Sequence, residues 1–349
     1  MKCKAAILNK LNEPLIIEDI EIPNLQCGQV LVQVRASSIC GAQIGEINGA
    51  KGEDKYLPHL LGHEGGGIVC DVGEGVTQVK IGDNVVLHWK KGLGIESPFP
   101  KYKYDGGIVG GGSVTTFNEY AVISENRLTV IDKSISFEIA ALMGCSVTTG
   151  LGLINNEAQL KIGQSIVVIG CGGVGLNVIQ GAFMVSANPI ISIDKNPHKL
   201  FTSLQYGATH NILAVDSDTN IEERVRKIVG GRGVDVVVDC TGVVGLINQG
   251  YRITSSNGKM ILVGQPRHGE NLIFTSMRDH YCGKTIMDSQ GGLTNPNIDI
   301  QRYLDLYSLG KLHLNKLISQ SFPLHLVNEA INLIQDGIGN KYILRMDGA

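Results

Sequence analysis

The sequence predicts an α/β protein in which a β-rich part precedes a doubly wound parallel sheet. Residues 1–146 contain short apolar or alternating runs separated by glycines and polar turns, which is typical of an antiparallel barrel or sandwich. Residues 147–289 alternate between apolar runs and helical segments, which is the pattern of a parallel sheet with crossover helices. A chain of 349 residues is long enough for two such domains.

Four strands are expected in the first part, and alternation places Val30, Val32 and Val34 on one face of the second. The expected strands are 14–22, 29–36, 65–72 and 82–87. The segment 90–112 is rich in glycine, lysine and tyrosine, and we expect a long surface loop there.

The second part is expected to hold a helix over 174–185 and another over 221–228. Its expected strands are 166–169, 190–193, 234–239 and 259–263. In the tail we expect helices at 300–309 and 326–335, and a final strand at 342–345 that returns to the first domain. The predicted domains are therefore 1–146 together with 290–349, and 147–289.

A glycine-rich turn follows the strand at 166–169. Gly170, Gly172 and Gly175 complete a G-x-G-x-x-G pattern before a helical segment, and Asp194 ends the next strand about 20 residues later. The first glycine allows a tight turn, the second lets the backbone approach a pyrophosphate, and the third lets helix and strand pack closely. The pattern predicts a dinucleotide site. A carboxylate at Asp194 can bond both ribose hydroxyls and would repel a 2′-phosphate, which favours NAD over NADP.

Two other interpretations of 165–185 are a buried glycine-rich helix and a membrane span. Asn177 and Gln180 interrupt the segment, and the chain has no unbroken apolar run of about 18 residues, which argues against a span. The formal net charge of −3 gives no reason to expect a nucleic acid or an anionic membrane as a partner. The N-terminal apolar stretch is too short for a secretory signal, so we expect a cytoplasmic protein.

The eight cysteines include no C-x-x-C pair. In the cytosol they should be reduced, so each is either a small buried hydrophobe or a metal ligand. Cys40, His63 and Cys145 stand in the segments SICG, LGHEGGG and LMGCSVTT. Spacing alone does not join the three, and each taken singly is more simply explained as structural.

Taken in order, these segments resemble the zinc-dependent medium-chain alcohol dehydrogenases. The resemblance spans nearly the whole chain and includes the segments IC, GHEGGGIV, GEGV with the following GD, GC, GCGGVG and FPL with the following NEA. It implies a GroES-like β domain that carries zinc and substrate, a Rossmann domain that carries NAD, and an active site in the cleft between them. It also implies a homodimer or homotetramer.

The matching positions imply Cys40, His63 and Cys145 as ligands of a catalytic zinc, and Glu64 as an acid beside the metal that can act in ligand exchange. Two cysteines and one histidine with an open fourth position are a recognised catalytic zinc set. The zinc would act as a Lewis acid on the substrate oxygen while the nicotinamide accepts or delivers hydride.

The resemblance also implies residues near the cofactor. Thr149 matches a residue that touches the nicotinamide, and Lys341 matches a basic residue near the pyrophosphate. The predicted cofactor-binding residues are Thr149, Gly170, Gly172, Gly173, Val174, Gly175, Asp194, Lys195, Lys199, Thr241, Val263 and Lys341.

At three positions that follow Cys40, the residue differs from the one that is usual in the family. Ala42 and Gly45 replace the hydroxyl and the histidine of the usual proton relay, and Gln43 replaces the aspartate that accepts from the ligand histidine. The amide oxygen of glutamine can still accept the imidazole N–H, but a neutral acceptor makes His63 less electron-rich and the zinc slightly more acidic. The smaller side chains open space, so we expect a bulkier, polar substrate rather than a small aliphatic alcohol.

Without that relay, the proton leaves through water or substrate hydroxyls, or another base serves. His59 and His88 are the candidate bases, although each is more simply explained as a structural histidine. Trp89 matches a position that often places an aromatic ring in the substrate pocket, with an ordinary core role as the alternative. Lys90 and Lys91 could meet an anionic substrate group, but solvated loop lysines are the simpler interpretation. The predicted substrate residues are Ala42, Gln43, His59 and Trp89.

The family's structural zinc lobe needs four closely spaced cysteines, and no cysteine lies between Cys70 and Cys145. We therefore expect one catalytic zinc per chain and no structural zinc. The expected function is reversible hydride transfer between a primary or secondary alcohol and NAD. One alternative is NAD-dependent oxidation of a hydroxyl on a sugar, amino sugar, cyclitol or nucleotide-linked sugar. The other is a non-catalytic NAD-binding protein, against which the presence of all three ligands and Glu64 argues.

Overall fold

The computed structural model describes residues 1–215, 220–273 and 280–346. The chain forms two compact units, of which the first contains residues 1–148 and 295–349 and the second contains residues 149–294. The first unit is therefore assembled from two separate stretches of sequence, whereas the second is continuous.

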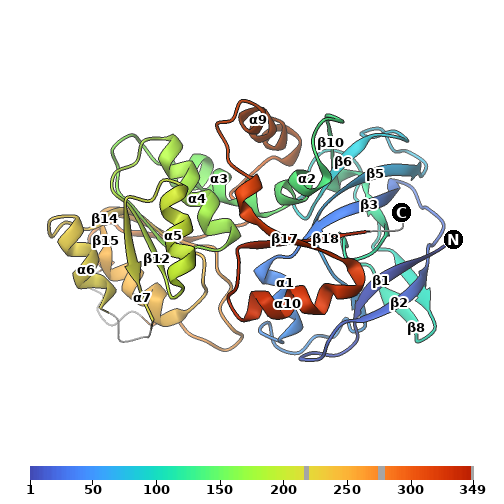
Figure 1. Ribbon diagram of the computed structural model, residues 1–349, viewed down its shortest axis with the longest axis horizontal. Helices are drawn as coiled ribbons and strands as arrows, with labels where there is room; N and C mark the ends of the chain where they lie inside the picture. The colour runs from blue at the N-terminus through green and yellow to red at the C-terminus, as the bar shows by residue number, and fades with distance from the viewer. Residues whose placement is uncertain (216–219, 274–279, 347–349) are drawn as a thin grey trace. The chain divides into compact units, whose positions relative to one another are not determined.

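The first unit is built from a closed barrel and an adjoining sheet (Figure 1). The barrel strands, in the order β1-β2-β7-β8-β4, are β1 Lys2–Leu8, β2 Ile16–Glu21, β7 Lys101–Tyr104, β8 Gly107–Gly110 and β4 His59–Leu60. The sheet has the order β10-β6-β5-β3-β18-β17, with β9 also paired to β3. Its strands are β10 Leu128–Ile131, β6 Asn84–His88, β5 Glu64–Val72, β3 Gln29–Ser38, β18 Lys341–Arg345, β17 Ile318–Pro323 and β9 Tyr120–Ser124. The predicted β-rich first part is confirmed.

The core of this sheet forms where the sequence alternates. Val30, Val32 and Val34 of β3 are fully buried on one face. The final strand β18 pairs antiparallel with β3, with Ile343 opposite Ser38. The predicted return of the C-terminal strand to the first domain is therefore confirmed.

The loop expected over residues 90–112 is wrong between residues 101 and 110, where β7 and β8 form a hairpin. Tyr102 pairs with Val109, both side chains are fully buried in the barrel, and the Tyr102 hydroxyl accepts a hydrogen bond from the Val122 N–H at 2.9 Å. Gly107, with φ of +121°, allows the tight turn. The glycines allow a hairpin turn rather than a long surface loop, and Tyr102 supplies buried apolar surface.

The second unit is a six-stranded sheet in which every pair of neighbours is parallel. Its strands, in spatial order, are β13 His210–Leu213, β12 Ile190–Asp194, β11 Ile166–Ile169, β14 Val234–Asp239, β15 Thr254–Leu262 and β16 Thr285–Asp288. The bounds of β11 and β14 agree with the prediction, whereas β15 begins five residues before the expected 259.

Helices cover both faces of this sheet (Figure 1). They are α4 Gly173–Met184, α5 Pro197–Gln205, α6 Ile221–Ile228 and α7 Val244–Ile253. The chain moves outward from β11 to β13 and then returns to β14, so right-handed crossovers place α4 and α5 on one face and α6 and α7 on the other. The doubly wound arrangement is confirmed, and the carboxyl ends of β11 and β14 mark the point where the strand order reverses.

Further helices connect and flank these sheets. They are α1 Gly41–Ile47, α2 Phe137–Met143, α3 Ser146–Gly152, the π-helical turn η2 Leu153–Ala158, α9 Pro296–Ser308 and α10 Val327–Gln335, with the 3₁₀ turns η1 Glu125–Arg127, η3 Asn315–Leu317 and η4 Leu324–Leu326. The expected helix at 300–309 starts four residues earlier than predicted, at Pro296, because proline fits the first turn of a helix. The segment Val327–Gln335 agrees with the expected helix at 326–335 to within one residue.

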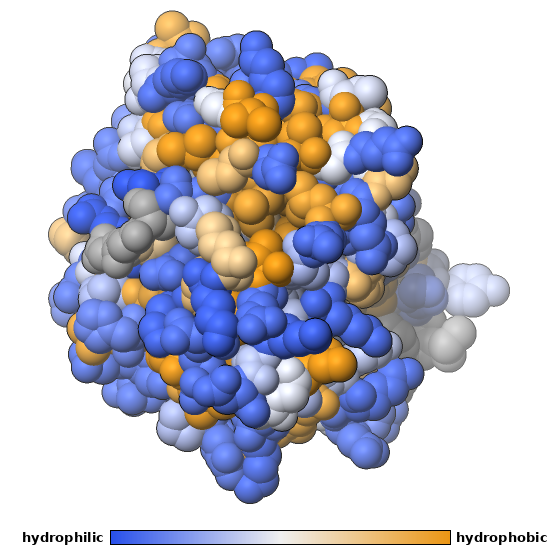
Figure 2. Space-filling model, turned by 90° about the vertical axis from the view of Figure 1, so that its right-hand side faces the viewer, coloured by the Kyte–Doolittle hydropathy of each residue, from blue (hydrophilic) through white to orange (hydrophobic). Residues whose placement is uncertain are grey.

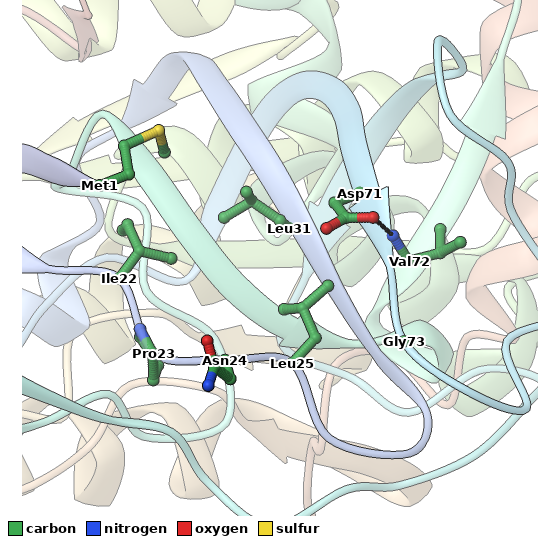
Figure 3. Close-up of a pocket in the computed structure, with 9 residues that line it drawn as sticks. All are labelled: Met1, Ile22, Pro23, Asn24, Leu25, Leu31, Asp71, Val72 and Gly73. Carbon is green, nitrogen blue, oxygen red and sulfur yellow. Dashed lines mark hydrogen bonds between the residues drawn. The ribbon is translucent and has the colours of Figure 1, made fainter.

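One face of the molecule carries a band of apolar side chains (Figure 2). A surface pocket of about 410 Å³ in the first unit is lined by Met1, Ile22, Leu25 and Leu31, with the Asp71 carboxylate at one side (Figure 3). No predicted site residue lines that pocket.

Among the described residues, no single helix is long and apolar enough to cross a membrane. One bent pair of helices, 137–143 with 146–158, has the length and composition to do so.

Candidate active site

Three side chains from distant parts of the sequence meet in the first unit. Cys40 stands between β3 and α1, His63 between β4 and β5, and Cys145 between α2 and α3. One ligand atom from each residue, a sulfur or an imidazole nitrogen, lies within 4.8 Å of the other two. The structure therefore brings together the residues that spacing alone could not join.

Strand register explains this meeting point. Ser37 of β3 pairs with Gly65 of β5, so the end of one strand, which leads to Cys40, lies beside the start of the other, which follows His63. Gly144 closes the arrangement, because a Cβ atom there would lie 2.5 Å from the Leu87 carbonyl oxygen and 2.7 Å from the Glu64 Cα. Only glycine lets the end of α2 approach the β5–β6 pair this closely, and Cys145 follows it directly.

A hydrogen bond between the two thiols shifts their pKa values in opposite directions. A hydrogen bond from Cys145 lowers the pKa of Cys40 well below its ordinary value, despite burial. The same contact, together with burial, raises the pKa of Cys145. Burial acts to lower the pKa of His63, but the negative charge on Cys40 outweighs it and the pKa is raised. These shifts favour the thiolate at Cys40 and the protonated thiol at Cys145.

A buried nitrogen without a partner tests whether a metal fits. His63 Nε2 and Gln43 Oε1 are both buried, and neither has a hydrogen-bond partner. The other two polar atoms of these side chains, Gln43 Nε2 and His63 Nδ1, contact each other. Exchanging the amide oxygen and nitrogen of Gln43 lets the oxygen accept the Nδ1–H and leaves a lone pair on Nε2. A zinc ion would then satisfy His63 Nε2 and both sulfurs, so the residues present fit the metal.

Glu64 and Lys341 form a buried ion pair next to these residues. Glu64 has no exposed surface and Lys341 is 4% exposed. The Lys341 ammonium contacts Glu64 Oε1 and donates to the Ile39 carbonyl oxygen at 3.1 Å, while Glu64 Oε2 accepts the Ser146 N–H at 3.2 Å. Burial raises the pKa of Glu64. Burial opposes the charge on Lys341, but the Glu64 carboxylate outweighs it and the lysine pKa is raised.

Sequence reasoning did not predict this contact, and the role of Lys341 near the pyrophosphate stays a prediction. The structure places the lysine in the first unit, with its ammonium held by Glu64 and Ile39. The predicted return of the final strand to the first domain could have indicated this contact, because it brings Lys341 into the domain that contains Ile39 and Glu64.

The glycine turn in the second unit has the shape that a dinucleotide requires. Gly170 has a φ of +94°, and a Cβ atom on Gly175 would lie 1.9 Å from the Gly170 carbonyl oxygen. In contrast, a Cβ atom on Gly172 would meet nothing within 4 Å, so the space in front of it is open. Because α4 begins at Gly173, its first N–H groups face a free anion site, and a pyrophosphate fits there.

Asp194 is tied to that turn. Its Oδ2 accepts the Cys171 N–H at 2.7 Å, and its Oδ1 accepts the Asn196 N–H at 2.8 Å. These bonds fix the carboxylate at the end of β12, and each oxygen keeps a lone pair for a ribose hydroxyl.

The other predicted cofactor residues of the second unit stand mostly at the same edge of the sheet. Lys195, Thr241 and Val263 follow the carboxyl ends of β12, β14 and β15, and Lys199 lies on α5. The Thr241 methyl group is 2.8 Å from the position of a Cβ on Gly170. Thr149 is buried on α3, beside Gly150, which packs against Asn177 of α4.

Comparison with known proteins agrees with this geometry. The family model described as alcohol dehydrogenase GroES-like domain matches residues 26–133, and the one described as zinc-binding dehydrogenase matches residues 173–308. Alcohol dehydrogenase 3 of Hordeum vulgare is 30% identical over 374 residues, covering 99% of this chain and 98% of the relative. The S-(hydroxymethyl)glutathione dehydrogenase of a Synechocystis species is 30% identical over 363 residues, covering 97% and 98%.

The chain belongs to the zinc-dependent medium-chain dehydrogenase family.

Solved structures of this family have the same fold. An alcohol dehydrogenase zinc-binding domain protein from Burkholderia ambifaria has a TM-score of 0.90 at 27% identity, with 99% of both chains covered. The benzyl alcohol dehydrogenase of Acinetobacter calcoaceticus has a TM-score of 0.89 at 25% identity, again with 99% of both chains covered. This medium-chain dehydrogenase is therefore an oxidoreductase of the alcohol dehydrogenase family, with a GroES-like and a Rossmann-type domain.

The two histidines considered as bases in this dehydrogenase are both engaged. His88 is buried, its Nδ1 is bonded to the Lys90 carbonyl oxygen at 2.6 Å and its Nε2 to Thr129 at 3.0 Å. Burial lowers the pKa of His88 to about 4, so the ring is neutral near pH 7 and serves as a structural histidine. His59 Nε2 lies 3.0 Å from the Asp54 carboxylate, and its Nδ1 donates to the Leu60 carbonyl oxygen at 2.9 Å.

The remaining predicted substrate residues follow Cys40 in α1 or stand at the end of β6. Ala42 and Gln43 are on α1, directly after Cys40, with Gln43 buried and Ala42 partly exposed. Trp89 is partly buried and follows β6, and its carbonyl oxygen contacts the Arg127 guanidinium. The Lys91 ammonium lies 3.5 Å from the Glu96 carboxylate in an exposed ion pair.

Within the described part of the chain, a second group could hold a cation, namely Glu46, Asp54 and His59. Lys51 lies 3.6 Å from Glu46, so positive charge already faces that group. Neither group consists of four cysteines. The expectation of a single catalytic zinc and no structural zinc stays a prediction.

Proposed function

We propose that this protein catalyses reversible hydride transfer between an alcohol and NAD, with one zinc held by Cys40, His63 and Cys145. The first unit would carry the zinc and substrate, and the second would carry NAD. The observation that carries the proposal is a ring nitrogen of His63 and two cysteine sulfurs within 4.8 Å of one another, with His63 Nε2 buried and without a hydrogen-bond partner. When bound, the zinc supplies Lewis-acid polarisation of the substrate oxygen.

The chain's own residues set up that chemistry. Gln43 holds the His63 ring through Nδ1, which fixes the direction of Nε2. Glu64 and Lys341 form a neutral pair, so the acid stands beside the ligands without adding net charge. The open space at Gly172 and the carboxylate of Asp194 would hold the pyrophosphate and ribose of NAD.

The proposed substrate is a bulky, polar alcohol such as a polyol, sugar or cyclitol. Ala42 offers no hydroxyl to carry a proton, so the alcohol proton would pass to water or to a second hydroxyl of the substrate. The small side chain at this position also leaves room beside the ligand. Two relatives are named for large alcohols, benzyl alcohol and S-(hydroxymethyl)glutathione.

The test is a substrate screen on the purified, zinc-loaded protein. NADH formation would be followed at 340 nm with ethanol, primary and secondary alcohols, polyols, sugars and cyclitols, with zinc content measured on the same sample. We expect about one zinc per chain and a higher kcat/KM for polyhydroxy substrates than for ethanol. Preference for ethanol would overturn the substrate class, and no turnover of any alcohol would overturn the enzymatic function.

We further propose that the chain acts in the cytoplasm as a homodimer or homotetramer.

Cofactor choice gives a separate prediction. Asp194→Asn should lower kcat/KM with NAD about tenfold, because a charged hydrogen-bond acceptor for the ribose is lost. The same change should raise the NADP-to-NAD ratio, because the carboxylate no longer repels the 2′-phosphate. Steady-state kinetics with both cofactors measures the effect, and Asp305→Asn, at an exposed position on α9, is the control. An unchanged ratio would remove the role assigned to Asp194.

A further inference from the structure

A buried arginine holds the backbone of the only tryptophan. Arg127 belongs to the turn η1, between β9 and β10, and is 6% exposed. Its Nη1 donates to the Trp89 carbonyl oxygen, and its Nη2 donates to Glu96 Oε1 at 2.8 Å. One guanidinium thus connects Trp89 to a carboxylate seven residues further along the chain.

The neighbours of Arg127 in the same turn hold the segment 89–97 from other sides. Glu125, which is fully buried, accepts the Ile95 N–H through Oε1 at 2.8 Å. Asn126 donates from Nδ2 to Glu96 Oε2 at 2.8 Å, and its carbonyl oxygen accepts the Gly92 N–H at 2.7 Å. Three consecutive side chains of η1 therefore determine the path of this segment.

Trp89 stands at the end of the strand pair that carries the metal-ligand group. Glu64 pairs with His88 in the β5–β6 register, so the next residues at this end of the pair are His63 and Trp89. The Leu87 carbonyl oxygen of the same strand faces Gly144, which precedes Cys145. The backbone of Trp89 therefore lies at the end of the strand pair that leads to His63.

The arginine contact is well suited to fix that backbone. Trp89 lies beyond the last paired residue of β6, so no ladder bond between strands orders its carbonyl group. A guanidinium donates from a planar fork, and its orientation is set when a carboxylate binds a second edge. Lys91 also faces Glu96, at 3.5 Å, but its side chain is 64% exposed and an exposed pair of this kind contributes little order.

We propose that Arg127 is a positioning residue that holds Trp89 in the substrate pocket through the Trp89 carbonyl group, with Glu96 fixing the guanidinium. The structural part stands on the contacts above. The effect on substrate rests on the proposed function, together with the prediction from sequence that Trp89 is a substrate residue. Arg127 itself touches no reacting group in this proposal, and it acts through Trp89.

Intrinsic fluorescence tests the structural part without any turnover. Trp89 is the only tryptophan, so the emission of the full-length protein reports this ring alone. Arg127→Gln should shift the emission maximum to longer wavelength and increase acrylamide quenching about twofold, because the freed segment exposes the indole. Arg127→Lys keeps the positive charge but lacks the planar guanidinium fork, so its emission maximum and quenching should lie between those of the wild type and Arg127→Gln. The control is Arg226→Gln, which removes an arginine from a partly exposed pair with Glu222 in the second unit and should leave emission unchanged.

Kinetics on a substrate found in the screen tests the functional part. Arg127→Gln should raise KM about tenfold with a smaller change in kcat, and zinc content should stay at the wild-type value. In a Trp89→Ala background, Arg127→Gln should change KM less than twofold, because the group through which it acts is absent. Independent effects that multiply in the double variant would overturn the positioning role.

Two further outcomes are informative. If Arg127→Gln fails to fold, Glu96→Gln replaces it, since this change weakens the anchor of the guanidinium and should shift emission in the same direction by a smaller amount. Unchanged emission and quenching in a folded variant would overturn the proposal. If no alcohol is turned over, the proposed function fails, whereas the fluorescence result still decides whether Arg127 holds Trp89.

Discussion

Cys40→Ser should lose its zinc and lower kcat/KM about a thousandfold. The serine hydroxyl stays protonated near neutral pH and is a poor zinc ligand, so the site would keep one thiolate and one imidazole. Lewis-acid stabilisation by zinc is worth several kcal/mol, and each 1.4 kcal/mol corresponds to about tenfold in rate. Elemental analysis and steady-state kinetics on the same preparation measure both effects.

Cys27→Ser is the matched control, because Cys27 is exposed and lies outside the ligand group. It should retain zinc and activity. NADH binding to Cys40→Ser, measured by titration, should stay within about twofold of wild type, because the glycine turn and Asp194 belong to the second unit. Full turnover by a zinc-free Cys40→Ser protein would remove metal catalysis from the proposed function.

Lys341→Met should destabilise the first unit by about 3–5 kcal/mol, because it leaves the carboxylate of Glu64 buried without its cation. Methionine fills a similar volume, so the main loss is the charge and not the packing. The remaining Ser146 N–H cannot replace an ammonium, and Glu64 must either stay charged at a high cost or take up a proton. Denaturant unfolding of the zinc-loaded protein measures the change in the free energy of unfolding.

The control for this variant is Lys10→Met, which breaks the pair with Glu13 on the surface. Both side chains of that pair are at least half exposed, so its loss should change stability by less than about 1 kcal/mol. Equal stability of wild type and Lys341→Met would mean that the buried pair contributes nothing to the first unit.

Some elements could be predicted to the residue from sequence. The strands β11 and β14 and the helix α6 have the expected bounds. Both strands are rich in β-branched apolar residues, and Gly170 follows β11 while Asp239 ends β14. The helix α6 starts after Asn220, whose side chain accepts the Glu223 N–H. Local signals decide these elements, because a buried strand needs a continuous apolar run and a helix needs a cap.

Other features depend on contacts that no local pattern contains. The hairpin β7–β8 was missed because its glycines indicated a loop, while burial of Tyr102 depends on barrel strands far away in sequence. The contact between Lys341 and Glu64 could not be predicted, because the two residues are 277 positions apart in the sequence. Arg127 was not predicted as a functional residue, because the residues next to it in the sequence do not indicate that its side chain reaches the Trp89 carbonyl oxygen.

The order of the two units along the chain has a consequence for synthesis on the ribosome. The second unit is encoded without interruption between residues 149 and 294, so it can close while the last 55 residues are still to come. The first unit cannot, because β18 must insert between β3 and β17, and Lys341 arrives with it. Domains generally fold as units during synthesis. Cys40 and Cys145 are therefore made early but reach their finished surroundings last. Truncation near the C-terminus would damage the fold of the first unit before that of the second.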